Sequence, residues 1–299
     1  MKPKLILLFV LLFSLNVFAQ VNLPRESQRQ EISQTVGDTK ISIVYHRPNV
    51  KARKIWGCQT NDLLPKDGVS YPCLVPYGQV WRTGANENTT FEVSNDVVVN
   101  GQKLPAGKYG LHTIPNKDDW TIIFSKVNDA WGSFTYDRKN DALRVTAKPQ
   151  TGAFQETMSI NFDGVLPTVA EVTIAWENLR VPFTVDVGDV SGRTLTQIRA
   201  AIQNRKADDI RPLNQGANYV LTSKIKNSYD EALGWLDESL KSKETFSTLN
   251  LKARILAEAG RKQDAIIAGE KAVQIGKAAT PPIDTSALEK LIADWNAGK

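Results

Sequence analysis

The side chains best suited to chemistry lie in four short segments that combine basic, aromatic and glycine residues. These segments are residues 53–57, 81–87, 109–113 and 131–134. Glycine permits tight turns, whereas arginine, histidine and tryptophan recognise charged or planar ligands. The candidate ligand-binding residues are Arg53, Lys54, Trp56, Trp81, Arg82, Asn86, Glu87, His112 and Trp131.

These nine residues would suit a pocket for a small anionic or carbohydrate ligand. The planar guanidinium group of Arg82 matches a carboxylate or a phosphate, and Arg53 and Lys54 would add positive charge. The tryptophan rings would form walls on which a sugar stacks. We therefore expect the nine side chains to surround one surface pocket. In the alternative interpretation, Glu87 pairs with Arg82 or Arg53, and the tryptophans fill the protein core.

The same residues do not complete a familiar catalytic motif. The chain has no G-x-S-x-G sequence and no glycine-rich phosphate loop, and no second carboxylate is spaced to face Glu87. His46 and His112 are the two histidines, and their spacing matches no metal motif, so we predict neither a metal site nor a cofactor. The sequence leaves catalysis open and favours a binding protein. The alternative is a hydrolase or lyase for envelope or plant-derived sugars, with Glu87 and His112 as acid and base and Arg82 stabilising negative charge.

The charge balance does not indicate a nucleic-acid partner. Lys plus Arg outnumber Asp plus Glu by only 37 to 32. No basic block is interleaved with aromatic residues, which is the pattern typical of nucleic-acid binding. We therefore expect no nucleic-acid ligand.

The chain contains two cysteines, Cys58 and Cys73. They bracket a polar segment, residues 59–72, that includes turn-forming Asn, Asp and Gly residues. In an oxidising compartment two such cysteines most simply form a disulfide, which would stabilise the fold by about 3 kcal/mol. A metal or redox site is the alternative, but no CxxC spacing supports it.

The pattern from residue 39 to residue 187 is typical of short antiparallel strands. Ile41, Ile43 and Tyr45 alternate with their neighbours in the period of two expected of a strand with one buried face. Asn100-Gly101 is a strong signal for a two-residue hairpin. About ten strands without an intervening helix predict an all-β antiparallel sandwich, jelly-roll-like in form.

The pattern changes after Gly188, and residues 189–299 are predicted to form an α-helical tail. Ala232 and Ala265 lie in similar contexts at about the 34-residue period of tetratricopeptide repeats. We therefore predict repeat-like hairpins from Tyr229 to Gly276, and an ordinary helical bundle is the alternative. In either case we expect the helices to pack on the β domain and to offer a surface for a protein partner.

The N-terminus has the features of a cleavable secretory signal. Lys2 and Lys4 precede an apolar run, residues 5–15, and Ala19 stands before Gln20 at the expected cleavage point. The run is shorter than the roughly 20 residues of a membrane-spanning helix, and no comparable run follows. We expect residues 1–19 to be a signal peptide and residues 20–188 to be the β-sandwich domain. The mature protein would then be periplasmic or secreted, without an integral membrane segment.

Five dense motifs stand out along the β-rich part: Arg47-Pro48 and residues 53–57, 74–78, 81–87 and 104–113. Together they resemble the domain of unknown function family 2911. The resemblance covers about residues 33–187 and implies an exported bacterial protein with a β-rich domain, often followed by a helical tail. It implies no activity and no catalytic residues. This chain departs from the family by an insertion between Gly57 and Leu74. Cys58 and Cys73 lie at the two ends of the insertion, which supports their pairing as a staple for the added loop.

Overall fold

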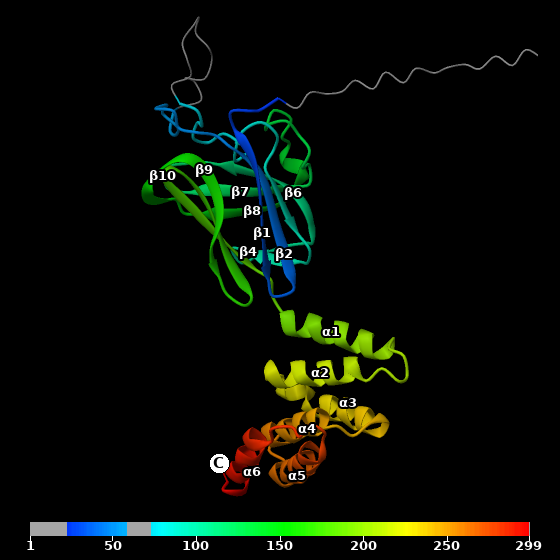
Figure 1. Cartoon of the computed structure of the whole chain (residues 1–299). Coiled ribbons are helices and arrows are strands. Elements are labelled where there is room, and N and C mark those ends of the chain that lie inside the picture. Colours follow the sequence, from blue (N-terminus) through cyan, green and yellow to red (C-terminus); the bar gives the residue numbers. More distant parts are fainter. Residues whose placement is uncertain (1–22, 59–72, 299) are drawn as a thin grey trace, which may run out of the picture.

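The computed structural model describes residues 23–58 and 73–298, in which ten strands come first and six α-helices follow (Figure 1). The strands form two antiparallel sheets that enclose one apolar core. The predicted all-β sandwich followed by an α-helical region is therefore confirmed. The predicted signal peptide lies outside the described residues.

The larger sheet has six strands in the order β1-β2-β3-β6-β7-β8. Its strands are β1 (Gln28–Val36), β2 (Thr39–Arg47), β3 (Thr90–Val93), β6 (Gly107–Ile114), β7 (Trp120–Ser125) and β8 (Asp141–Ala147). The smaller sheet has the order β5-β4-β10-β9. Its strands are β4 (Val97–Val99), β5 (Gln102–Leu104), β9 (Gln150–Val165) and β10 (Val169–Asp186).

Alternate side chains of each strand fill the space between the sheets. Ile41, Ile43 and Tyr45 of β2 are buried there, as the period of two predicts. Leu111 of β6 and Phe183 of β10 belong to the same core cluster, so both sheets contribute to it. The residues between these inward positions consequently point to the outer faces of the sheets.

The six α-helices pack in sequence order and lead away from the β domain (Figure 1). They are α1 (Val190–Gln203), α2 (Arg211–Thr222), α3 (Tyr229–Ser242), α4 (Phe246–Glu258), α5 (Lys262–Ala278) and α6 (Ser286–Asn296). Short 3₁₀ turns occupy Arg138–Asn140 and Lys226–Ser228. Ala232, Ala253, Ala265 and Ala272 are fully buried where helices meet. The likeness to tetratricopeptide repeats stays a prediction.

None of the helices in the described ranges has both the length and the apolar character needed to cross a membrane.

We expected the helical tail to pack on the β domain, but within the described residues it contacts that domain only through the start of α1. Its buried apolar residues form two clusters that are separate from the core between the sheets. The first turn of α1 makes the contact, because Val190 packs at Gly37 and Arg193 donates two hydrogen bonds of 2.6 and 2.9 Å to Asp38. The stacked helices bury one another's apolar faces, which removes the need for a β-domain surface.

The predicted disulfide between Cys58 and Cys73 is confirmed. Both cysteines are buried, and their Cα atoms lie 5.6 Å apart. The flanking backbone supports the bond, since the N–H group of Val75 donates to the carbonyl oxygen of Ile55 at 2.7 Å. The two ends of the insertion are therefore held side by side.

We predict that replacing both cysteines with alanine lowers the free energy of unfolding by about 3 kcal/mol, because the unfolded chain regains the freedom of the closed loop. Urea unfolding of wild type and of Cys58→Ala/Cys73→Ala measures the difference. Reductant should destabilise the wild type and leave the double variant unchanged. Equal urea midpoints for the oxidised wild type and the double variant would show that the bond does not stabilise the fold.

Candidate ligand-binding site

One of the candidate residues, His112, lies on the outer face of the six-stranded sheet. Tyr109 and Leu111 of β6 point into the core, so Gly110 and His112 point outward. The chain between β7 and β8 crosses this face. A Cβ atom at Gly110 would collide with the carbonyl oxygen of Val127, so the crossing chain lies directly on β6. Only glycine leaves room for so close an approach.

Two hollows open on either side of this crossing chain. The Glu87 hollow, of about 670 Å³, is lined by residues that include Arg25, His46, Glu87, Lys108 and Ala130. The Arg82 hollow, of about 210 Å³, is lined by Leu74, Val75, Pro76, Gln79, Val80, Trp81, Arg82, Ser133 and Phe134. Residues 128–130 border the first hollow and residues 133–134 border the second. One loop thus shapes both.

The charge of Glu87 is satisfied within the protein. Arg25 donates two hydrogen bonds of 2.6 and 2.7 Å to the carboxylate of Glu87, and its guanidinium group lies 5.5 Å from the ring centre of Trp131. The Arg25 bonds hold the pKa of Glu87 below its usual value. Nε2 of His46 lies 3.3 Å from the same carboxylate. Burial lowers the pKa of His46 more than the charge of Glu87 raises it, so the imidazole is neutral near pH 7.

The Arg82 hollow contains a cation without a protein partner. Within the described ranges the Arg82 guanidinium group makes no hydrogen bond and no ion pair, and its partial burial lowers the pKa of the group. It lies against Gly132, where a Cβ atom would come within 2.6 Å of Nη1 and 2.9 Å of the Phe134 ring. Gly132 has a φ of +72°, which also favours glycine. The glycine at this turn therefore leaves the space that the Arg82 guanidinium group occupies.

Ser133 connects this hollow to the buried His112. Nδ1 of His112 and Oγ of Ser133 lie 2.9 Å apart, and only 3% of His112 is exposed. Burial lowers the pKa of His112 to about 4, although the charge of Asp141 acts in the opposite direction. The imidazole is consequently neutral at pH 7. Its Nδ1 can either accept a hydrogen bond from the serine hydroxyl or donate one to it.

A three-residue network holds the loop against His112. The Tyr136 hydroxyl donates to Oδ2 of Asp141 at 2.7 Å, and Nε of Arg144 donates to the same atom at 2.6 Å. Nη2 of Arg144 also donates to the Tyr136 hydroxyl at 2.7 Å. The Tyr136 ring meets the imidazole of His112 edge-on, with the ring centres 5.2 Å apart. The network therefore fixes the wall beside the imidazole.

The structure distributes the nine predicted residues over several environments. Trp56 and Trp81 pack with Trp120 and Trp176, and Trp56 is buried in the core. Trp81 and Arg82 line the Arg82 hollow, and His112 reaches it through Ser133. Glu87 lines the other hollow, Trp131 lies beside Arg25, and Asn86 donates to the carbonyl oxygen of Ser27.

Arg53 donates to the carbonyl oxygens of Val50 and Asn49, and neither Arg53 nor Lys54 lines either hollow. Their joint role in one pocket stays a prediction.

Arg25, Ser133 and Asp141 contribute to the hollows but are not among the nine residues predicted from the sequence. Arg25 precedes the first strand, and nothing in its spacing links it to Glu87. Ser133 stands in a segment already singled out for Trp131, but a serine follows no recognisable motif there. The period of two does place His112 on the outer face of the sheet, which is the signal that could have led to these neighbours.

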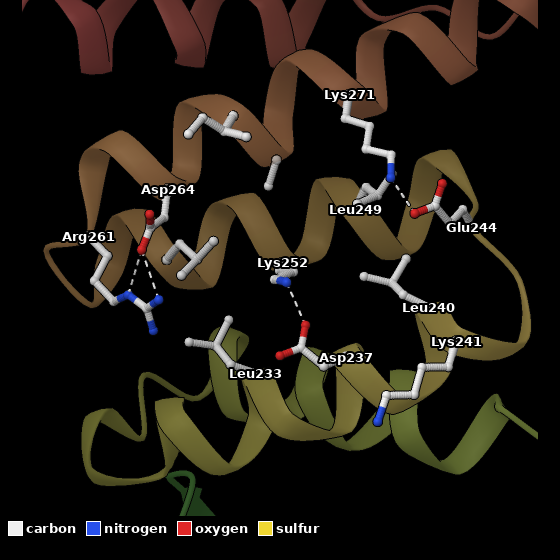
Figure 2. Close-up of a pocket in the computed structure, with 13 residues that line it drawn as sticks. Leu233, Asp237, Leu240, Lys241, Glu244, Leu249, Lys252, Arg261, Asp264 and Lys271 are labelled. Carbon is white, nitrogen blue, oxygen red and sulfur yellow. Dashed lines mark hydrogen bonds and ion pairs between the residues drawn. The ribbon is translucent and has the colours of Figure 1, made fainter.

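A third hollow, of about 630 Å³, lies on the helical tail across α3, α4 and α5. Leucines such as Leu233, Leu240 and Leu249 line it, and ion pairs join its rims (Figure 2). Lys252 pairs with Asp237 and Lys271 pairs with Glu244. Because most of its charges are paired, this hollow is less suited to a small ion than the Arg82 hollow.

The structure thus consists of a two-sheet β domain, which carries the small Arg82 hollow, and a helical tail. A family model described as "Protein of unknown function (DUF2911)" matches residues 27–185. The chain belongs to this family, which confirms the resemblance seen in its motifs. Neither a curated protein nor a solved structure matches the chain.

We predict that His112 makes the fold sensitive to mild acid. Between pH 6.5 and 4 the unfolded chain binds a proton on His112 that the folded chain excludes, so the free energy of unfolding falls with falling pH, by about 3 kcal/mol in all. His112→Gln should remove this part of the pH dependence. Urea unfolding at several pH values measures it.

His46→Gln is the matched control, because Glu87 partly offsets the effect of burial on the pKa of His46. It should flatten the pH dependence less than His112→Gln does. If the His112 variant loses as much stability as the wild type between pH 6.5 and 4, the predicted role of His112 is wrong.

Proposed function

We propose that the β domain is a binding module for a small anionic ligand, which Arg82 holds in the Arg82 hollow. The observation that carries this proposal is the half-buried guanidinium group without a partner among the described residues. A partly desolvated charge is costly unless it is paired, and a carboxylate or phosphate would pair it in a bidentate manner. Ser133 offers a hydroxyl group in the same hollow.

The ligand is small and partly apolar on this proposal. The hollow is smaller than the 300–1,000 Å³ common for drug-sized ligands. Val75, Pro76 and Trp81 supply apolar walls around the charged and polar groups. A short carboxylate with an apolar body fits these walls better than a bare inorganic ion, because its body would bury apolar surface.

Three other proposals receive less support. A sugar hydrolase or lyase that uses Glu87 and His112 as acid and base would need both groups to face one substrate. In the structure Glu87 contacts Arg25 and His46, whereas His112 contacts Ser133. A carbohydrate could stack on Trp131, which is 55% exposed, but Arg25 lies against that ring. For a protein partner on the helical tail, the support is limited to the leucine residues that line the hollow across α3, α4 and α5.

The proposed setting is outside the cytoplasm. The disulfide fits an oxidising compartment, and the N-terminal sequence has the features of a cleavable secretory signal. A periplasmic or secreted binding module would meet small carboxylates in solution, where an open surface hollow is accessible to them.

We predict that benzoate raises the melting temperature of the mature chain and that Arg82→Gln lowers benzoate affinity about tenfold or more, because a charged hydrogen-bonding partner is lost. Thermal shift and calorimetric titration measure both effects. Without ligand, Arg82→Gln should be at least as stable as the wild type, since it removes an unpaired charge.

Lys54→Gln is the matched control, because Lys54 is exposed and does not line the hollow. It should bind benzoate as the wild type does, and neutral benzamide should bind neither protein well. An equal loss of affinity in both variants would favour the single pocket predicted from the sequence. Failure of benzoate, acetate and phosphate to bind the wild type would reject the proposal.

A further inference from the structure

We propose that Ser133 and His112 form a nucleophile and base pair at the edge of the Arg82 hollow, which hydrolyses small esters that carry a negative charge. The activity goes beyond ligand binding, and its preference for charged esters rests on the proposed anion binding by Arg82. Three arrangements in the structure carry the inference: the serine–imidazole contact, the support behind the imidazole, and the cation in the hollow.

The contact between serine and imidazole has the geometry of a nucleophile and its general base. Oγ of Ser133 lies 2.9 Å from Nδ1 of His112, within the range required for proton transfer. Ser133 is only partly buried and lines the hollow, so its oxygen is accessible to a ligand, whereas His112 is buried behind it. A hydroxyl group open to a ligand and backed by a buried imidazole is the arrangement that serine nucleophiles need.

The imidazole packs against Tyr136, and Asp141 holds Tyr136 in place. The Tyr136 ring packs on the imidazole, and the Tyr136 hydroxyl and Arg144 hold Oδ2 of Asp141. The other oxygen of Asp141, Oδ1, is buried and has no hydrogen-bond partner within the described ranges. The negative charge of Asp141 would stabilise His112 when it carries a proton. Asp141 is therefore a positioning residue of this centre.

Arg82 and the backbone of the loop define the substrate class. The guanidinium group would bind an anionic substituent of the substrate, and the small volume of the hollow restricts the acyl part to a short chain. The backbone N–H groups of Ser133 and Phe134 donate to no other group in the described part of the chain. They are available to stabilise the oxygen that becomes negative as the serine attacks.

The chemical step balances with water as the second substrate. Oγ of Ser133 forms a bond to the ester carbonyl carbon, and its proton passes to Nδ1 of His112. The bond from that carbon to the leaving oxygen breaks, and the leaving alkoxide takes the proton. Water then attacks the acyl-serine and gives a proton to His112, which returns it to Oγ as the acid departs. Ester and water yield acid and alcohol, and nothing is oxidised or reduced.

The deciding experiment treats the mature chain with a fluorophosphonate, which bonds to activated serines, and locates the adduct by mass spectrometry. We expect the adduct on Ser133 and hydrolysis of both p-nitrophenyl succinate and p-nitrophenyl acetate. Ser133→Ala should abolish adduct and turnover, and His112→Asn should slow both about 100-fold. Thr135→Ala, an exposed change in the same loop, should leave both unchanged.

Two further variants test the assigned roles. Arg82→Gln should raise KM for the charged ester about tenfold and leave the neutral ester unaffected. Asp141→Asn should shift the acid limb of the pH–rate profile to lower pH, because the Asp141 charge raises the pKa of His112. A purely structural role for Asp141 would lower the rate without shifting that limb.

The proposal is overturned if Ser133 takes up no fluorophosphonate or if Ser133→Ala hydrolyses the esters at the wild-type rate. Ser133→Ala decides the matter even where a His112 variant fails to fold, because Ser133 is partly exposed. Benzoate binding separates this inference from the proposed function. Binding without adduct or hydrolysis rejects only the activity, and hydrolysis without benzoate binding or charge preference rejects only the anion site.

Discussion

The close approach of the loop between β7 and β8 to strand β6 is the constraint on which the candidate site depends. Gly110 permits it, because any side chain there would collide with the carbonyl oxygen of Val127. With the loop seated on the sheet, Ser133 reaches His112, and the turn at Gly132 receives the guanidinium group of Arg82. A small displacement of the loop would separate all three groups.

Desolvation and pairing give the two hollows different chemistry although they share one loop. In the Glu87 hollow the carboxylate is paired with Arg25, so this carboxylate is not open to a ligand. In the Arg82 hollow the cation lacks a partner within the described ranges, and the neighbouring imidazole is held neutral by burial. Positive charge without a counter-charge, next to a hydroxyl group, is what an anion requires.

The sequence was sufficient for features that depend on neighbours along the chain. The period of two placed Ile41 and Ile43 in the core, and Asn100-Gly101 forms the hairpin between β4 and β5, where both residues have positive φ. Features that depend on strand order were beyond it. Nothing local indicates that Arg25 would reach Glu87 from 62 positions away, or that the loop between β7 and β8 would bring Ser133 against His112.

The tautomer of the neutral His112 imidazole would link the two proposed properties of the Arg82 hollow, anion binding and ester hydrolysis. A neutral imidazole carries its proton on one nitrogen only. If Nδ1 of His112 accepts from Ser133, the serine oxygen presents lone pairs to the hollow and can act as a nucleophile. If Nδ1 donates instead, the hydroxyl proton faces the hollow and can bind an anion beside Arg82. A bound anion favours the second tautomer, so a carboxylate product would withdraw the serine from attack until it leaves, and the two proposed properties would compete at one site.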